Sequence, residues 1–146
     1  MKIKIKPFKE FLVNELYKSL ALRNEVFIVE QNCIYQDVDG YDDKALHVLM
    51  FDNDDLVAYA RIFDKGIKYP TASIGRVVVS PAKRNLNLGH LLVNAAVQGV
   101  HEHFQTEEIT ISAQEHLQKF YAAHGFVTTS EMYLEDDIPH VEMQIK

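Results

Sequence analysis

The feature that most constrains the fold is a change of hydrophobic period in the middle of the chain. Residues 73–80 are rich in β-branched side chains, which is typical of a buried strand. From Leu88 to Phe104 the apolar residues recur at the spacing of one helical face, and residues 108–113 again indicate a strand. This order predicts a right-handed βαβ crossover between two parallel strands.

Shorter periodic segments flank this unit on both sides. They are a lysine-isoleucine strand at 2–6, a helix at 8–29, apolar strands at 47–51 and 56–63, a short helix at 117–124 and closing strands at 127–134 and 140–145. The order predicts an α/β (α+β) fold with one mixed central sheet of six to seven strands flanked by helices. We expect a single domain spanning residues 1–146.

Charged residues are unevenly distributed along the chain. The net charge of −6 argues against a nucleic-acid binder that works through bulk positive charge. No acidic residue lies between Lys65 and His101, whereas eight acids and a single lysine lie between Glu30 and Asp55. The acid-free window favours an anion site in the middle of the chain over chance clustering on solvated surfaces.

The remaining composition excludes several classes of protein. The single cysteine, Cys33, can form no internal disulfide or multi-thiolate metal site, and it fits a reducing compartment. His101 and His103 are two apart on a predicted helix and point to different faces, so we expect no zinc site. No signal peptide and no apolar stretch of membrane-spanning length is evident. We therefore expect a cytoplasmic protein without membrane or metal partners.

The loop between the central strand and helix, residues 81–89, is the strongest candidate for the anion site. A strand-to-helix turn leaves the first N–H groups of the helix free, and the helix dipole favours a negative ligand there. Lys83 and Arg84 add positive charge, and Asn85, Asn87 and Gly89 tolerate left-handed or closely approached backbone. The alternative is an ordinary βα loop built from turn residues.

Two motifs in this half of the chain resemble those of the GNAT superfamily of N-acetyltransferases. Arg84-x-x-Asn87-x-Gly89 is similar to the family's Arg/Gln-x-x-Gly-x-Gly/Ala loop, with Asn87 in place of the first glycine. Phe120-Tyr121-x-x-x-Gly125-Phe126 is similar to its Phe-Tyr-x-x-x-Gly-Phe signature. Residues 22–40, 56–61, 74–77 and 138–140 resemble the ElaA-like branch, so that the resemblance covers nearly the whole chain.

The resemblance implies an acyl-CoA N-acyltransferase fold and an N-acetyltransferase that uses acetyl-CoA as co-substrate. A small amine or peptide amine would attack the thioester directly, and Tyr121 would protonate the departing thiolate. The residues that it implies for acetyl-CoA binding are Val77, Val78, Val79, Arg84, Asn85, Leu86, Asn87, Leu88, Gly89, His90, Gln114 and Tyr121.

The acceptor side is less defined by the sequence. The candidates for a catalytic base are Glu30, His140, His47 and Glu142, in no firm order, and a chain of water molecules is the alternative. Arg23, Arg61 and Arg76 lie in or beside apolar segments. We expect Arg23 to pair internally with Glu30, Asp37 or Asp39. For the other two arginines, internal pairing and binding of a substrate carboxylate both stay open. The acidic stretch would either attract a cationic amine or form a solvated face.

Two other functions are consistent with parts of the pattern. A non-catalytic acyl-CoA sensor on the same fold would keep the loop and lack turnover. A nucleotide-binding module lacks support, because neither Gly-x-x-x-x-Gly-Lys-Ser/Thr nor Gly-x-Gly-x-x-Gly occurs. The first edge strand and the closing hairpin could pair between chains, so that a homodimer is left open.

Overall fold

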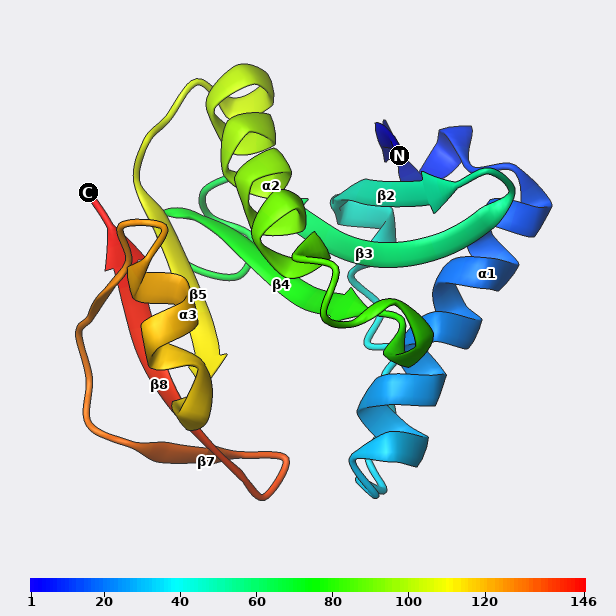
Figure 1. The fold of residues 1–146 in the computed structure, drawn as a ribbon. Coiled ribbons are helices and arrows are strands. Elements are labelled where there is room, and N and C mark those ends of the chain that lie inside the picture. The colour runs from blue at the N-terminus through cyan, green and yellow to red at the C-terminus, as the bar shows by residue number, and fades with distance from the viewer.

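Eight strands form one mixed sheet in the computed structural model, which describes all residues from 1 to 146 (Figure 1). The strand order is β1-β2-β3-β4-β5-β8-β6, with β7 also paired to β8, and only β4 and β5 run parallel. The expected fold class is confirmed. The count exceeds six to seven because residues 127–134 form two short strands instead of one. The strands are β1 (Lys2–Pro7), β2 (Leu46–Asp52), β3 (Asp55–Phe63), β4 (Ala72–Val79), β5 (Ile109–Gln114), β6 (Val127–Thr128), β7 (Tyr133–Glu135) and β8 (Ile138–Ile145).

Three α-helices accompany the sheet: α1 (Val13–Arg23), α2 (Leu88–Phe104) and α3 (Gln118–Ala122). The predicted first helix was wrong at its start, since it begins at Val13 and not near residue 8. The Glu15 carboxylate accepts a hydrogen bond from the Leu12 N–H at 3.0 Å, which caps the helix there. After Arg23 the chain continues as a wider π-helical segment, Asn24–Glu30. None of these helices combines the length and apolar character needed to cross a membrane.

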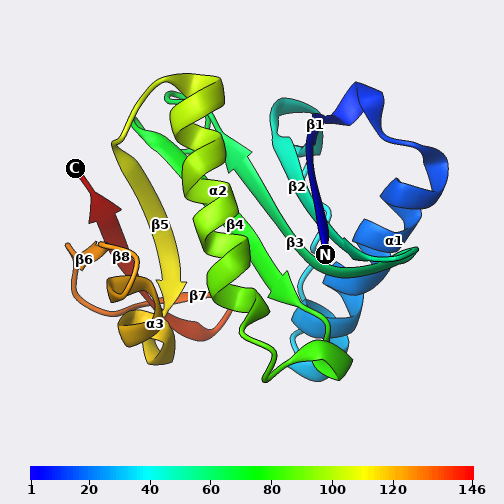
Figure 2. The same ribbon diagram turned by 45° about the horizontal axis from the view of Figure 1, so that its top comes forward.

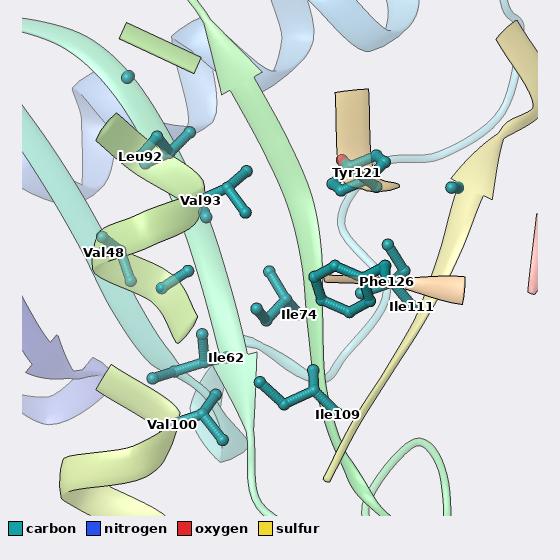
Figure 3. Packing of buried hydrophobic residues seen from close by; sticks show 14 of the residues in the cluster. Val48, Ile62, Ile74, Leu92, Val93, Val100, Ile109, Ile111, Tyr121 and Phe126 are labelled. Atoms are coloured by element: carbon teal, nitrogen blue, oxygen red, sulfur yellow. The ribbon is translucent and has the colours of Figure 1, made fainter. Parts of the chain in front are cut away.

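The core has two parts because strand side chains alternate between the two faces of the sheet. Helix α2 packs on one face, where Figure 3 shows Leu92 and Val100 beside Val48 and Ile62. On the opposite face, Leu22 and residues after it cover Tyr59 and neighbouring strand residues. Figure 2 shows the resulting layers, with α2 across the near face and α1 behind the sheet.

The parallel strands β4 and β5 pair only at their beginnings. Ala72 lies opposite Ile109 and Ser73 opposite Thr110, and beyond these pairs the two strands diverge (Figure 1). A bulge in β4 lies at the divergence. Between the pairs Arg61–Gly75 and Tyr59–Val78, β4 spans three residues and the antiparallel β3 only two, so β4 contains one extra residue. Arg76 takes φ of 51° at this bulge. Such bulges bend a strand and leave local backbone groups unpaired, which opens the sheet at this point.

Candidate active site

A cavity of about 130 Å³ lies where β4 and β5 diverge. Its wall comes from β4, β5, α3, the π-helical segment with the loop that follows it, and the β7–β8 hairpin. Five different elements each contribute a lining residue that is important for the site: Val77, Gln114, Tyr121, Glu135 and His140.

Tyr121 is the buried aromatic side chain at this cavity. Its ring makes edge-to-face contacts with Phe120 and Phe126 at centroid distances of 5.0 and 5.9 Å. Gly125, with φ of 93°, lets the chain reverse so that the Phe126 N–H donates to the Tyr121 carbonyl at 3.3 Å. Burial raises the pKa of Tyr121, which keeps the phenol protonated. Figure 3 shows the ring between β4 and β5 with its hydroxyl on the side of β4.

The loop before α2 has the backbone of an anion site. Asn85 and Asn87 are left-handed, with φ of 71° and 62°, as the sequence predicts for the asparagine that replaces glycine. The N–H groups of Leu88, Gly89 and His90 donate to no backbone carbonyl. Gly89 has helical backbone, and its lack of a side chain lets the Phe120 ring pack closely. A Cβ at this position would lie 3.3 Å from that ring.

Most of the expected acetyl-CoA residues gather at one of two neighbouring places. A depression before α2 is lined by Val79, Arg84, Asn85, Asn87, Leu88, Gly89, His90 and Phe120, and the cavity is lined by Val77, Gln114 and Tyr121. Two expected residues lie apart. The Val78 side chain is buried on the opposite face with the α1 cluster, and Leu86 is exposed. For Val78, only the backbone groups are therefore suited to contact a ligand in the cavity.

The basic residues of the loop have acidic partners from the early part of the chain. Arg84 donates two hydrogen bonds to the Glu30 carboxylate, at 2.6 and 2.7 Å, and Lys83 lies 3.3 Å from Asp52. The hydrogen bonds from Arg84 lower the pKa of Glu30. Glu30 is exposed and does not line the cavity. The structure thus joins this candidate base to the loop before α2.

Of the other candidate bases, only His140 lines the cavity. Its Nδ1 lies 2.7 Å from the Ile138 carbonyl oxygen, and its Nε2 lies 3.5 Å from a Glu135 carboxylate oxygen. His47 is buried elsewhere, between the Tyr59 hydroxyl and the Asp42 carbonyl, and burial lowers its pKa. Glu142 accepts a hydrogen bond from Thr129 outside the cavity.

The three ambiguous arginines are all paired internally. Arg23 bonds Asp37 at 2.7 Å and Asp42 at 3.0 Å. Arg61 bonds Asp42 at 2.9 Å and also pairs with Asp39, and Arg76 lies 2.7 Å from Asp37. The sequence pattern missed Asp42 as a partner, because nothing local distinguishes it from Asp43. This network ties the loop that follows the π-helical segment to β3 and β4.

Sequence reasoning also missed Glu135 and Ser112. The Ser112 hydroxyl donates to Glu135 at 3.0 Å and lies 2.5 Å from the Tyr133 hydroxyl. The signal that could have found them is the turn Asp136-Asp137, where both residues have positive φ. A two-residue turn at this point sets Glu135 opposite Ile138 and Tyr133 opposite His140.

Comparison with known proteins agrees with this geometry. A family model described as an acetyltransferase (GNAT) domain matches residues 13–146. Protein ElaA of Escherichia coli (strain K12) is 43% identical over 136 residues, covering 92% of this chain and 89% of that protein. The crystal structure of Escherichia coli ElaA is 39% identical, with a TM-score of 0.92 over 99% of both chains.

A second solved structure, an acyl-CoA N-acyltransferase from Pseudomonas aeruginosa, is 41% identical with a TM-score of 0.92. That match covers 98% of this chain and 97% of the other. The fold is therefore that of the acyl-CoA N-acyltransferases, a class whose donors are acyl-CoA thioesters. The chain belongs to the GNAT superfamily, in its ElaA-like branch.

Proposed function

We propose that the protein is an N-acetyltransferase that moves the acetyl group of acetyl-CoA to a primary amine, within one domain. The observation that carries this proposal is a buried tyrosine at the cavity where β4 and β5 diverge. The free N–H groups in the first turn of α2 support the donor side, because they suit the pyrophosphate of CoA. The pantetheine arm would run from this loop along β4 into the cavity.

The thioester carbonyl would lie against the part of β4 beyond the bulge. The proposed donors to the oxyanion are those backbone N–H groups of Val77 to Val79 that do not face β3. Strand β5 pairs with β4 only before this point, so it does not compete for these groups. Donors fixed in advance stabilise the developing negative charge without reorganising.

Proton transfers complete the proposed reaction. The acceptor enters as an ammonium, loses one proton to a base, and attacks the thioester carbonyl carbon as a neutral amine. The C–N bond forms, the C–S bond breaks, and Tyr121 gives its phenol proton to the departing thiolate. The phenolate regains a proton from the nitrogen of the new amide. The products are an N-acetyl amine, CoA thiol and one released proton.

Thiol release from acetyl-CoA tests the proposal directly. The assay uses the purified protein with acetyl-CoA and a panel of primary amines: ethanolamine, cadaverine, tyramine and lysine methyl ester. We expect amine-dependent release of CoA thiol and an acetylated amine of the matching mass. Binding of acetyl-CoA without turnover across the panel would favour the sensor function instead.

A further inference from the structure

His140 is held in one tautomer by its surroundings. A backbone carbonyl only accepts hydrogen bonds, so the 2.7 Å contact with the Ile138 oxygen requires a proton on Nδ1. In the neutral imidazole, Nε2 then carries the lone pair. The side chain is buried and lines the cavity, with its backbone paired to β5 on one side and β7 on the other. The ring is thus fixed with an unprotonated nitrogen available for a proton.

The carboxylate of Glu135 stands beside that nitrogen. One of its oxygens lies 3.5 Å from Nε2, and the other accepts the Ser112 hydroxyl at 3.0 Å. Neutral Nε2 and a carboxylate are both acceptors and form no hydrogen bond. Once Nε2 takes a proton, the two become an ion pair. The hydrogen bond from Ser112 holds the carboxylate beside Nε2.

The other charged and titratable groups that line the cavity do not reproduce this arrangement. Asp37 is engaged by Arg23 and Arg76, and the Tyr35 hydroxyl donates to Asp137. The Tyr133 ring stacks on His140 at 6.3 Å and adds no charge. The other titratable and charged residues that line the cavity are Cys33, Tyr35, Asp37, Arg76, Tyr121, Glu135 and Asp136.

We propose that Nε2 of His140 is the base that takes the proton from the acceptor ammonium, and that Glu135 is a positioning residue that stabilises the resulting imidazolium. This assignment rests on the N-acetyltransferase function proposed above and names the acceptor as an amine that enters protonated. The proton passes from the ammonium nitrogen to Nε2 and from there to solvent. Tyr121 serves the sulfur of the leaving group, so the two proton transfers use different residues.

The test is the pH profile of kcat/KM for thiol release with the best amine of the panel. His140→Asn retains a side-chain N–H near the position of Nδ1 and lacks a titrating base. We expect kcat/KM to fall about 100-fold near neutral pH and the acidic limb of the profile to disappear. The fall in kcat/KM should be smaller with aminoacetonitrile as the acceptor, because its weakly basic nitrogen is already neutral near neutral pH and needs no base. His103→Asn, an exposed histidine at the far end of α2, is the matched control.

Glu135→Gln separates the positioning role from a structural one. Without the carboxylate charge, we expect kcat to fall while KM for the amine stays nearly unchanged, because the imidazolium that forms after proton transfer loses its ion-pair partner. Exposed Glu107→Gln should leave kcat unchanged. Acetyl-CoA affinity should stay unchanged in both His140→Asn and Glu135→Gln.

Three outcomes would contradict the assignment. A wild-type pH profile in His140→Asn would exclude His140 as the base and leave the N-acetyltransferase function standing. An unchanged kcat in Glu135→Gln would remove the positioning role. Absence of turnover in the wild-type protein with every amine would overturn the proposed function, and the base assignment with it.

Discussion

At the scale of single residues, the burial of Tyr121 suits the role of an acid. Burial disfavours the phenolate, so the proton is present when the thiolate departs. The same side chain is part of the core cluster beside Phe126. Tyr121 is therefore both a packing residue and the proposed proton donor, and a useful substitution must remove only its hydroxyl.

Tyr121→Phe makes that change, and we expect it to lower kcat by about 100-fold with little effect on acetyl-CoA binding. The remaining rate would rely on water to protonate the sulfur. Steady-state thiol release and equilibrium binding of acetyl-CoA measure the two effects. The exposed Tyr17 supplies the matched control, Tyr17→Phe, which should leave both unchanged. An unaltered kcat in Tyr121→Phe would show that another group serves the thiolate.

At the scale of elements, the turn into α2 depends on left-handed backbone at Asn87. Alanine in this conformation costs roughly 1 kcal/mol more than glycine, because its Cβ approaches the following carbonyl. We expect Asn87→Ala to weaken acetyl-CoA binding about fivefold through distortion of the loop, and Asn87→Gly to retain it. Isothermal titration of both variants provides the comparison. Equal loss in the two would mean that the Asn87 side chain itself contacts the ligand.

The arginine–aspartate network is a second element-scale feature, because it joins the loop before β2 to the sheet. Asp42 accepts hydrogen bonds from both Arg23 and Arg61, each of which is almost fully buried. We expect Asp42→Asn to reduce the free energy of unfolding by about 3–5 kcal/mol, since it leaves two buried cations undercompensated. Urea denaturation measures this loss. Asp43→Asn, next to it and exposed, should cost less than about 0.5 kcal/mol.

The arginine–aspartate network also determines whether folding stability rises or falls in acid. Burial opposes ionisation of Asp39 and Asp42, but the neighbouring arginines outweigh it and hold both pKa values below the usual range. A lowered folded-state pKa contributes stability that is present above the unfolded pKa of about 4 and is lost as pH falls further. The urea concentration at the unfolding midpoint should therefore decrease as the pH falls below about 4. This decrease should be smaller in Asp42→Asn.

At the scale of the whole molecule, acetyl-CoA should bridge two parts of the fold. Its pyrophosphate would bind the loop before α2, and its thioester would lie beside α3 and β5 in the cavity. A ligand at one hundred times its Kd stabilises the folded state by about 2.7 kcal/mol, which corresponds to a rise in Tm of roughly 5–10 °C here. Differential scanning fluorimetry tests this. Pantetheine, which lacks the pyrophosphate, should give a much smaller rise, and no shift with acetyl-CoA would argue against the donor site.

Much of this architecture could be predicted because it is encoded locally. The period change from strand to helix placed the crossover, and the asparagine and glycine residues of the loop indicated its backbone. The resemblance of residues 120–126 to the family's signature implied that the phenol lies near the same site. Boundaries were harder. The first helix starts later than its apolar spacing suggests, because the Glu15 carboxylate caps it at Leu12.

Pairing between distant segments could be read from the sequence only in part, as the internal pairing expected for Arg23 and left open for Arg61 and Arg76. The acid-free window and the acidic stretch were interpreted as separate features, an anion site and a cation-attracting or solvated face. In the structure they face each other, as Arg76 with Asp37, Lys83 with Asp52 and Arg84 with Glu30. These partners lie 31 to 54 residues apart, so no local pattern could join them.

The order of elements, the crossover and the left-handed backbone of the loop before α2 follow from the sequence, because periodicity and turn chemistry act over a few residues. The particular partners of most charged residues, and the candidate base that lines the cavity, follow only from the folded arrangement. The bulge at Arg76 parts β4 from β5, and the two-residue turn before Ile138 brings Glu135 beside His140. Both depend on strand register, which is set by the packing of the whole sheet.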